Sequence, residues 1–162
     1  QFRDAELWIA AQSYTDLYYV GAKAHGSVRM QEISSEGPQR VWEETVHMWD
    51  ELPIEGTFGE FIGIGGTATS LAAIDLQMET YDPKQIQGHR MDRGTIEAMI
   101  LELRYMSREE RLQVKGLQPG RVDIIVPGAE IITSLMDTYQ IGSIVISEAD
   151  GLEGWQSQYG GR

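Results

Sequence analysis

The residues best placed to do chemistry lie in one short segment, Phe61-Ile-Gly-Ile-Gly-Gly-Thr-Ala-Thr-Ser70. An apolar strand is expected to run into Gly65 and Gly66, and a helix to begin at once with Thr67. Glycines let a ligand approach the backbone closely, and the N–H groups at a helix start attract anions. The segment therefore predicts an anion site. The alternative is a plain strand-to-helix turn in which glycine avoids a clash, because the spacing is neither that of the P-loop nor that of the dinucleotide fingerprint.

Positive charge for such a site is scarce. The 162-residue chain has 13 Lys and Arg against 25 Asp and Glu, a formal net charge of −12, which argues against broad nucleic-acid binding. Arg29, at the end of an expected strand, and Arg90 and Arg93, beside an expected helix start, could grip phosphate oxygens through forked hydrogen bonds. The alternative for each is a solvated arginine paired with one of the many carboxylates.

Several other chemistries are excluded or disfavoured. There is no cysteine, so disulfides, thiol catalysis and thiolate metal sites are absent, which fits a cytoplasmic location. None of the three histidines pairs with another at the i, i+4 spacing of a helical zinc site. No apolar run is long enough for a membrane span. The chain begins with Gln1 and not with Met, so we expect a processed or excised piece.

The elements that must position these residues predict one α/β domain of mixed sheet. Strands are expected at 5–10, 16–23 and 26–30 as an antiparallel meander, and at 61–64 and 141–147. Helices are expected at 38–52, from Thr67, from a cap at Asp92, from a capping box at Ser107 to Gly116, and at 131–139. Tyr81-Asp-Pro83 is expected to be a loop, and residues 122–126 alone favour a strand.

An ordered set of segments, spread over about residues 5–155, resembles the exopolyphosphatase / guanosine pentaphosphate phosphohydrolase (Ppx/GppA) family. The segments are Gly26-Ser-Val-Arg-Met-Gln-Glu32, Gly63-Ile-Gly-Gly-Thr-Ala-Thr-Ser-Leu-Ala-Ala-Ile-Asp-Leu76 with Tyr81-Asp-Pro83, Gly88-His-Arg-Met91, Met106-Ser-Arg-Glu-Glu-Arg111, Gly116-Leu-Gln-Pro-Gly-Arg-Val-Asp-Ile-Ile-Val-Pro-Gly-Ala129, and Ile144-Val-Ile-Ser-Glu148 with Gly151-Leu-Glu-Gly154.

The resemblance implies the second (C-terminal) domain of an actin-like two-domain core. That is an α/β, ribonuclease H-like domain over residues 1–155, with a tail at 156–162. Its mixed sheet would start with a three-stranded antiparallel meander and carry helices on both faces. The family resemblance also favours helix over strand at 122–126, with a kink at Pro127. It implies hydrolysis of the terminal phosphoanhydride of polyphosphate or guanosine pentaphosphate, with magnesium as the usual metal.

Carried over by position, Gly65, Gly66, Thr67 and Arg93 are the expected phosphate- or nucleotide-binding residues. Glu6 is a candidate for the end of the family's Asp-x-Gly-Gly-Gly-Ser-Thr-Glu loop, and Arg29 matches a family arginine. The resemblance places the catalytic glutamate on a first domain that these residues do not include. Glu153 also stands where the family usually has arginine. We therefore expect a fragment with no catalytic residue of its own. It should bind polyphosphate or nucleotide weakly and hydrolyse neither of them.

Two other functions remain open from the sequence. One is a non-catalytic actin-fold module for interaction or homodimerisation, with Tyr18, Tyr19 and Trp155 as aromatic anchors. The other is half of a sugar kinase-type ATPase. The first differs from the leading hypothesis in that dimerisation would be indifferent to polyphosphate.

Overall fold

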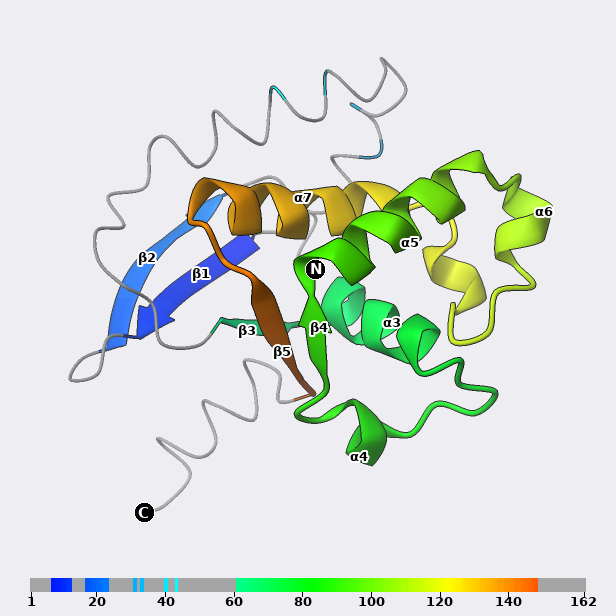
Figure 1. Cartoon of the computed structure of the whole chain (residues 1–162), viewed down its shortest axis with the longest axis horizontal. Helices are drawn as coiled ribbons and strands as arrows, with labels where there is room; N and C mark the ends of the chain where they lie inside the picture. Colours follow the sequence, from blue (N-terminus) through cyan, green and yellow to red (C-terminus); the bar gives the residue numbers. More distant parts are fainter. Residues whose placement is uncertain are drawn as a thin grey trace, which may run out of the picture.

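The computed structural model describes residues 61–148 in full, the backbone of residues 7–12 and 17–23, and the single residues 31, 33, 40 and 43. Figure 1 shows the arrangement of these parts. Strands β1 (Leu7–Gln12) and β2 (Leu17–Lys23) pair antiparallel, with a bulge between Ile9 and Ala10. They confirm the first two strands of the expected meander. The expected third strand at 26–30 lies outside the described residues.

A second sheet has three strands in the order β3-β5-β4, so the described strands form two separate sheets. In it, β3 (Ile62–Ile64) runs parallel to β5 (Ser143–Ser147), and β4 (Arg90–Asp92) runs antiparallel to β5. This is the expected mixed sheet. Its topology brings the carboxyl ends of β3 and β5 together, with Ile64 opposite Ser147.

Only one face of this sheet is buried within the described part of the chain. Met91, Ile144 and Ile146 point into the core with Gly63, whereas Ile62 and Ile64 on the other face are 54% and 52% exposed. Gly63 is required by packing, because a Cβ there would lie 3.2 Å from the Cβ of Ala68. Most of the helix expected at 38–52 lies outside the described residues, but Arg40 and Glu43 within it are helical.

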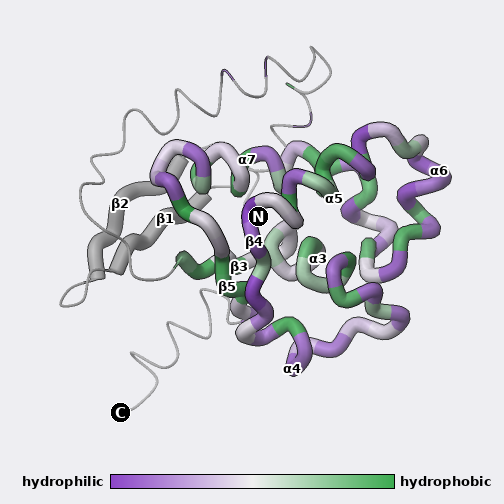
Figure 2. Tube along the Cα trace, in the orientation of Figure 1, coloured by the Kyte–Doolittle hydropathy of each residue, from purple (hydrophilic) through white to green (hydrophobic). Residues whose placement is uncertain are grey.

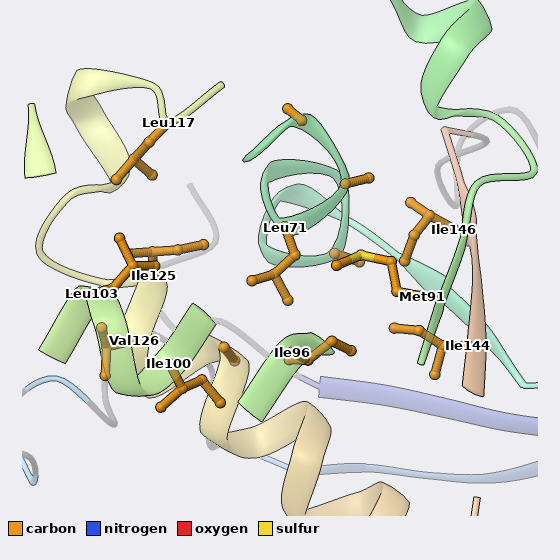
Figure 3. Close-up of a cluster of buried hydrophobic side chains, with 14 of the residues drawn as sticks. Leu71, Met91, Ile96, Ile100, Leu103, Leu117, Ile125, Val126, Ile144 and Ile146 are labelled. Carbon is orange, nitrogen blue, oxygen red and sulfur yellow. The ribbon is translucent and has the colours of Figure 1, made fainter. Parts of the chain in front are cut away.

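Three helices form the layer over the buried face: α3 (Gly66–Asp75), α5 (Arg93–Tyr105) and α7 (Ile125–Thr138). Leu71 of α3 lies near the centre of the cluster that they share with the sheet (Figure 3). The α7 helix is buried along most of its length, which fits a helix that is apolar almost all round. Outside α7, the largest fully buried side chains of the cluster are Leu71, Ile86, Met91, Ile96, Val122, Ile144 and Ile146.

Local sequence signals placed the helix starts well. α5 begins directly after Asp92, although the Asp92 side chain makes no capping hydrogen bond. At α6 (Arg108–Arg111) the predicted capping box is present in both directions between Ser107 and Glu110. This helix ends at Arg111 and not at Gly116 as expected. Figure 2 shows that α6 is hydrophilic, so it has no apolar face with which to extend into the core.

Two expectations were wrong in detail. Tyr81 and Asp82 are loop as expected, but Pro83, the third residue of the expected loop, begins α4 (Pro83–Ile86); Asp82 caps this helix by accepting a 3.0 Å hydrogen bond from the Lys84 amide. The strand favoured at 122–126 is absent: a turn follows the 3₁₀ helix η1 (Pro119–Arg121), and α7 begins at Ile125. Pro127 causes no kink, because it lies in the first turn, where a backbone N–H has no helical partner to lose.

A half-buried carboxylate links α5 to α7, and its raised pKa predicts a pH dependence of stability. Burial raises the pKa of Glu130 on α7, while the ion pair with Arg104 on α5 opposes that shift in part. A raised folded-state pKa contributes stability below the unfolded pKa, and this contribution is lost as pH rises. We expect the stability of Glu130→Gln, relative to the native chain, to increase between about pH 4 and pH 6. Urea unfolding across this range measures the difference, and Glu102→Gln on the exposed side of α5 should show no such trend.

None of the helices in the described ranges combines the length and the apolar character that a membrane crossing requires.

Candidate functional site

The start of α3 is an uncapped helix terminus. Gly65 is the N-cap residue, with φ 85° and ψ 172°, a conformation that is essentially restricted to glycine. It has no side chain to cap the helix, and the first helical bond runs from the Thr69 amide to the Gly65 carbonyl at 3.1 Å. The amides of Gly66, Thr67 and Ala68 therefore precede the first bonded turn and have no acceptor within the helix.

The hydroxyls of this turn have different roles. Ser70 is buried and donates to the Gly66 carbonyl at 2.6 Å, so its hydroxyl serves the helix. Thr69 lies 3.5 Å from the same carbonyl. Thr67 is half-buried at the second helical position, and Gly65 before it is exposed. Gly65, Gly66 and Thr67 thus lie together at an accessible helix start, as the sequence predicted.

The guanidinium of Arg121 lies directly against Gly66. A Cβ at residue 66 would overlap its Cζ, Nη1 and Nη2 atoms. Across the described ranges the side chain of Arg121 makes no hydrogen bond or ion pair, whereas those of Arg93, Arg104 and Arg108 all pair with carboxylates. A cation at the positive end of a helix dipole is unfavourable by itself. An anion bound between the guanidinium and the free amides would satisfy both groups.

The path of the chain explains how Arg121 reaches this position. Gly116, with φ 85°, packs against the carbonyl of Ala73 near the end of α3, and Arg121 packs against Gly66 at its beginning. The segment between them, which includes η1, therefore runs back along α3 toward the helix start. Leu117 anchors the segment in the core, at 6% exposure.

A second group of polar side chains adjoins this turn. The Tyr81 hydroxyl donates to Glu148, just past β5, and lies close to the Thr69 side chain. Burial is the main cause that raises the pKa of Tyr81, and the bond to Glu148 adds to it, while Thr69 and the charge of Arg121 act in the opposite direction. The phenol thus keeps its proton and donates it toward the carboxylate. The Glu148 amide in turn donates to the side-chain oxygen of Gln87 at 2.8 Å.

The position of these groups in the sheet is the usual one for a ligand site. Gly65 follows β3 and Glu148 follows β5, and these two strands are parallel neighbours. In open α/β sheets ligands bind outside the carboxyl ends of the strands. Four elements therefore meet here: the α3 start, the segment ending at Arg121, the loop at Tyr81 and the end of β5.

Arg93 does not lie near the start of α3. Its amide donates to the Gly142 carbonyl at 2.9 Å, beside the amino end of β5, whereas Gly65 lies beside the carboxyl end. Four residues of extended strand, roughly 13 Å, separate the two ends. The Arg93 side chain pairs with Glu97 at 3.3 Å and with Asp137, so two carboxylates neutralise it.

The other expected site residues fall elsewhere. Glu6 and Arg29 lie outside the described residues. Arg90 donates to the Ser143 hydroxyl at 3.0 Å, also at the amino end of β5. Sequence reasoning did not single out Arg121 or Tyr81 as site residues, and it favoured a plain acidic turn at Glu148, although that residue follows a strand end. The available signal for Arg121 was an arginine directly after Pro119-Gly120.

Magnesium, which the family resemblance implies, finds no ready-made site here. Within the described part of the chain, no three His, Asp or Glu side chains lie close enough together to hold a metal ion. Around the α3 start the described donors are one carboxylate and several hydroxyls, and the cation Arg121 lies among them. These residues do not fit a resident divalent cation.

Comparisons with known proteins find relatives whose names include a phosphatase and an exopolyphosphatase. Over 94 residues the chain is 31% identical to the bifunctional 3-dehydroquinate synthase/phosphatase of Fusobacterium nucleatum, covering 57% of this chain and 14% of that protein. Over 98 residues it is 31% identical to Exopolyphosphatase 2 of Mycobacterium tuberculosis, covering 58% of this chain and 31% of that protein. The matched region is thus less than a third of either relative.

Solved structures share the fold at low sequence identity. The crystal structure of the Aquifex aeolicus Ppx/GppA family member superposes with a TM-score of 0.80 at 18% identity, covering 98% of this chain and 58% of that one. An exopolyphosphatase-like protein gives 0.80 at 24% identity, covering 96% and 56%. These likenesses show the actin-like fold of that family. The family's sequence profile matches residues 25–155, most of the chain, and this chain therefore belongs to the Ppx/GppA phosphatase family.

Proposed function

We propose that this chain supplies the phosphate-binding half of a hydrolase that acts on the terminal phosphoanhydride of polyphosphate or guanosine pentaphosphate. The observation that supports this most directly is the guanidinium of Arg121 against Gly66, which has no partner among the described residues and lies at an uncapped helix start in a chain of net charge −12. Membership of the phosphatase family and the name of the M. tuberculosis relative supply the substrate class.

The site would act by holding charge and position. Phosphate oxygens would accept hydrogen bonds from the amides of Gly66 and Thr67, and from Arg121 as a fork. In phosphoryl transfer the attacking and leaving oxygens lie roughly in line, and catalysis is largely positioning and neutralisation of charge. The described residues offer these functions and no evident general base.

In this proposal the residue that activates the attacking water lies outside the α3 site. The family resemblance places the catalytic glutamate on another domain, and Glu6 stays a candidate within this chain. The chain spans 58% of the A. aeolicus structure and 31% of the M. tuberculosis relative. We therefore propose the hydrolase activity for a longer protein that contains this chain, and not for these residues alone. We expect the 162-residue chain to bind tripolyphosphate and to release no phosphate from it at an enzymatic rate.

Gly66→Ala tests the site with little effect on the fold. The new methyl group would displace the guanidinium, which is the free end of a flexible side chain, so stability should change by less than about 1 kcal/mol. Affinity for tripolyphosphate, measured by calorimetry, should fall roughly tenfold, because Arg121 can no longer lie over the amides.

Gly94→Ala is the matched control. Gly94 is the second residue of α5, where an added Cβ meets open space. Unchanged binding in Gly94→Ala with weakened binding in Gly66→Ala supports the α3 site. The reverse result would instead place the ligand at α5, beside Arg93. Absence of any heat of binding in the unmodified chain would refute the proposed function.

A further inference from the structure

The Arg121 side chain has no ion-pair partner among the described residues, although the carboxylate of Glu148 is near. The Tyr81 hydroxyl binds the Glu148 carboxylate, and the charge of Arg121 is near enough to act on the pKa of the same phenol. Yet no ion pair joins Glu148 to Arg121. Several other cations in residues 61–148 are each paired with a carboxylate: Arg93, Arg104, Arg108 and Lys115.

Two contacts hold Glu148 in its present place. Its carboxylate accepts the Tyr81 hydroxyl, and its amide donates to the Gln87 side chain at 2.8 Å. Gln87 also accepts from the Ser147 hydroxyl at 3.3 Å, so the end of β5 is fixed at two successive residues. The backbone direction and the carboxylate position are therefore both constrained.

The hydroxyl that holds Glu148 also adjoins the helix start. Tyr81 lies close to Thr69, whose hydroxyl is 3.5 Å from the Gly66 carbonyl one turn back along α3. Residues three apart are neighbours on a helix surface, and Arg121 lies against Gly66. The hydroxyl that binds the carboxylate is thus near the helix turn against which the guanidinium lies.

We propose that Tyr81 is a positioning residue: its hydroxyl holds the Glu148 carboxylate away from Arg121 and so keeps the guanidinium free for a phosphate ligand. The proposal rests on the anion site described under the proposed function. Without the hydroxyl, the carboxylate loses its fixed partner, and the cation beside it is Arg121. An internal Glu148–Arg121 ion pair would then compete with the ligand for the same guanidinium.

The test is a double-mutant cycle. Tyr81→Phe should weaken the binding of inorganic tripolyphosphate to the 162-residue chain by roughly two- to fivefold, the range of a partly exposed ion pair. Glu148→Gln should bind as tightly as the unmodified chain or more tightly, since no carboxylate can compete. The variant that carries both changes should recover the affinity that Tyr81→Phe loses.

Recovery is the result that a merely structural role cannot produce. If Tyr81 only supported the fold, removing Glu148 as well would leave binding weak or weaken it further. Tyr105→Phe on α5, where the side chain is almost fully exposed, and Glu79→Gln, exposed beside Lys115, are the matched controls. Thermal unfolding checks that each variant is folded. Unchanged affinity in Tyr81→Phe, or no recovery in the double variant, overturns the proposal.

A second measurement keeps the two proposals apart. The NMR resonance of the Arg121 side-chain Nε–H group reports ion pairing without any ligand. It should shift in Tyr81→Phe and return in the double variant. If tripolyphosphate fails to bind the unmodified chain but this shift appears, the proposed function is wrong and the positioning role is right. If binding occurs and the resonance does not move, the positioning role is wrong.

Discussion

Replacing Gly116 with alanine is expected to destabilise the domain by about 3 kcal/mol or more. Two effects add: a side chain at φ 85° is strained, and its Cβ would overlap the backbone carbonyl of Ala73 in α3. A backbone carbonyl within a packed helix cannot move aside as a flexible side chain can. Urea unfolding followed by circular dichroism measures the change in the free energy of unfolding.

Two other glycines separate the two contributions. Gly88 has φ 82° but open space around its missing Cβ, so Gly88→Ala should show the strain alone, about 1–2 kcal/mol. Gly142 has open space and no positive φ, so Gly142→Ala should be nearly neutral. If Gly116→Ala were no worse than Gly88→Ala, the close approach of the loop to α3 would be wrong. The path that brings Arg121 to Gly66 would then lose its anchor.

The part of the site that sequence predicted is the part that is local in the chain. An apolar strand, paired glycines and a hydroxyl-rich helix start follow one another within ten residues, and each signal concerns its immediate neighbours. Capping at Ser107 and the start of α5 after Asp92 were predictable for the same reason. Such features depend on backbone conformation and on hydrogen bonds within one turn.

The part that sequence missed depends on contacts between distant segments. Arg121 reaches Gly66 only because the chain passes Ala73 at Gly116, and no local pattern encodes that path. The three residues of β4 are a strand only because β5 supplies their partner. Arg93 shows the opposite error: an arginine at a helix start had the right local setting, but tertiary packing gave it Glu97 and Asp137 as partners.

Arg121→Gln should weaken tripolyphosphate binding by roughly 10- to 100-fold, the largest effect on affinity that we expect. A hydrogen bond to a charged group is stronger than a neutral one, and the substitution removes both the fork and the charge. The affinity of Arg121→Lys should fall between those of the unmodified chain and Arg121→Gln, because lysine keeps the charge and loses the bidentate geometry. Calorimetric titrations at two salt concentrations measure this, and the variant should also lose part of the salt dependence.

The same substitution, Arg121→Gln, should weaken binding without reducing the stability of the ligand-free chain. Without ligand, Arg121→Gln should be as stable as the unmodified chain, or slightly more stable, because it removes a cation from the positive end of the α3 dipole. With tripolyphosphate only the chain that binds it gains stability, by linkage. Arg108→Gln, which removes an exposed arginine paired with Asp123 at 3.3 Å, should leave binding unchanged. A large loss of stability in ligand-free Arg121→Gln would show instead that Arg121 serves the fold, and would remove the main support for an anion site at Gly66.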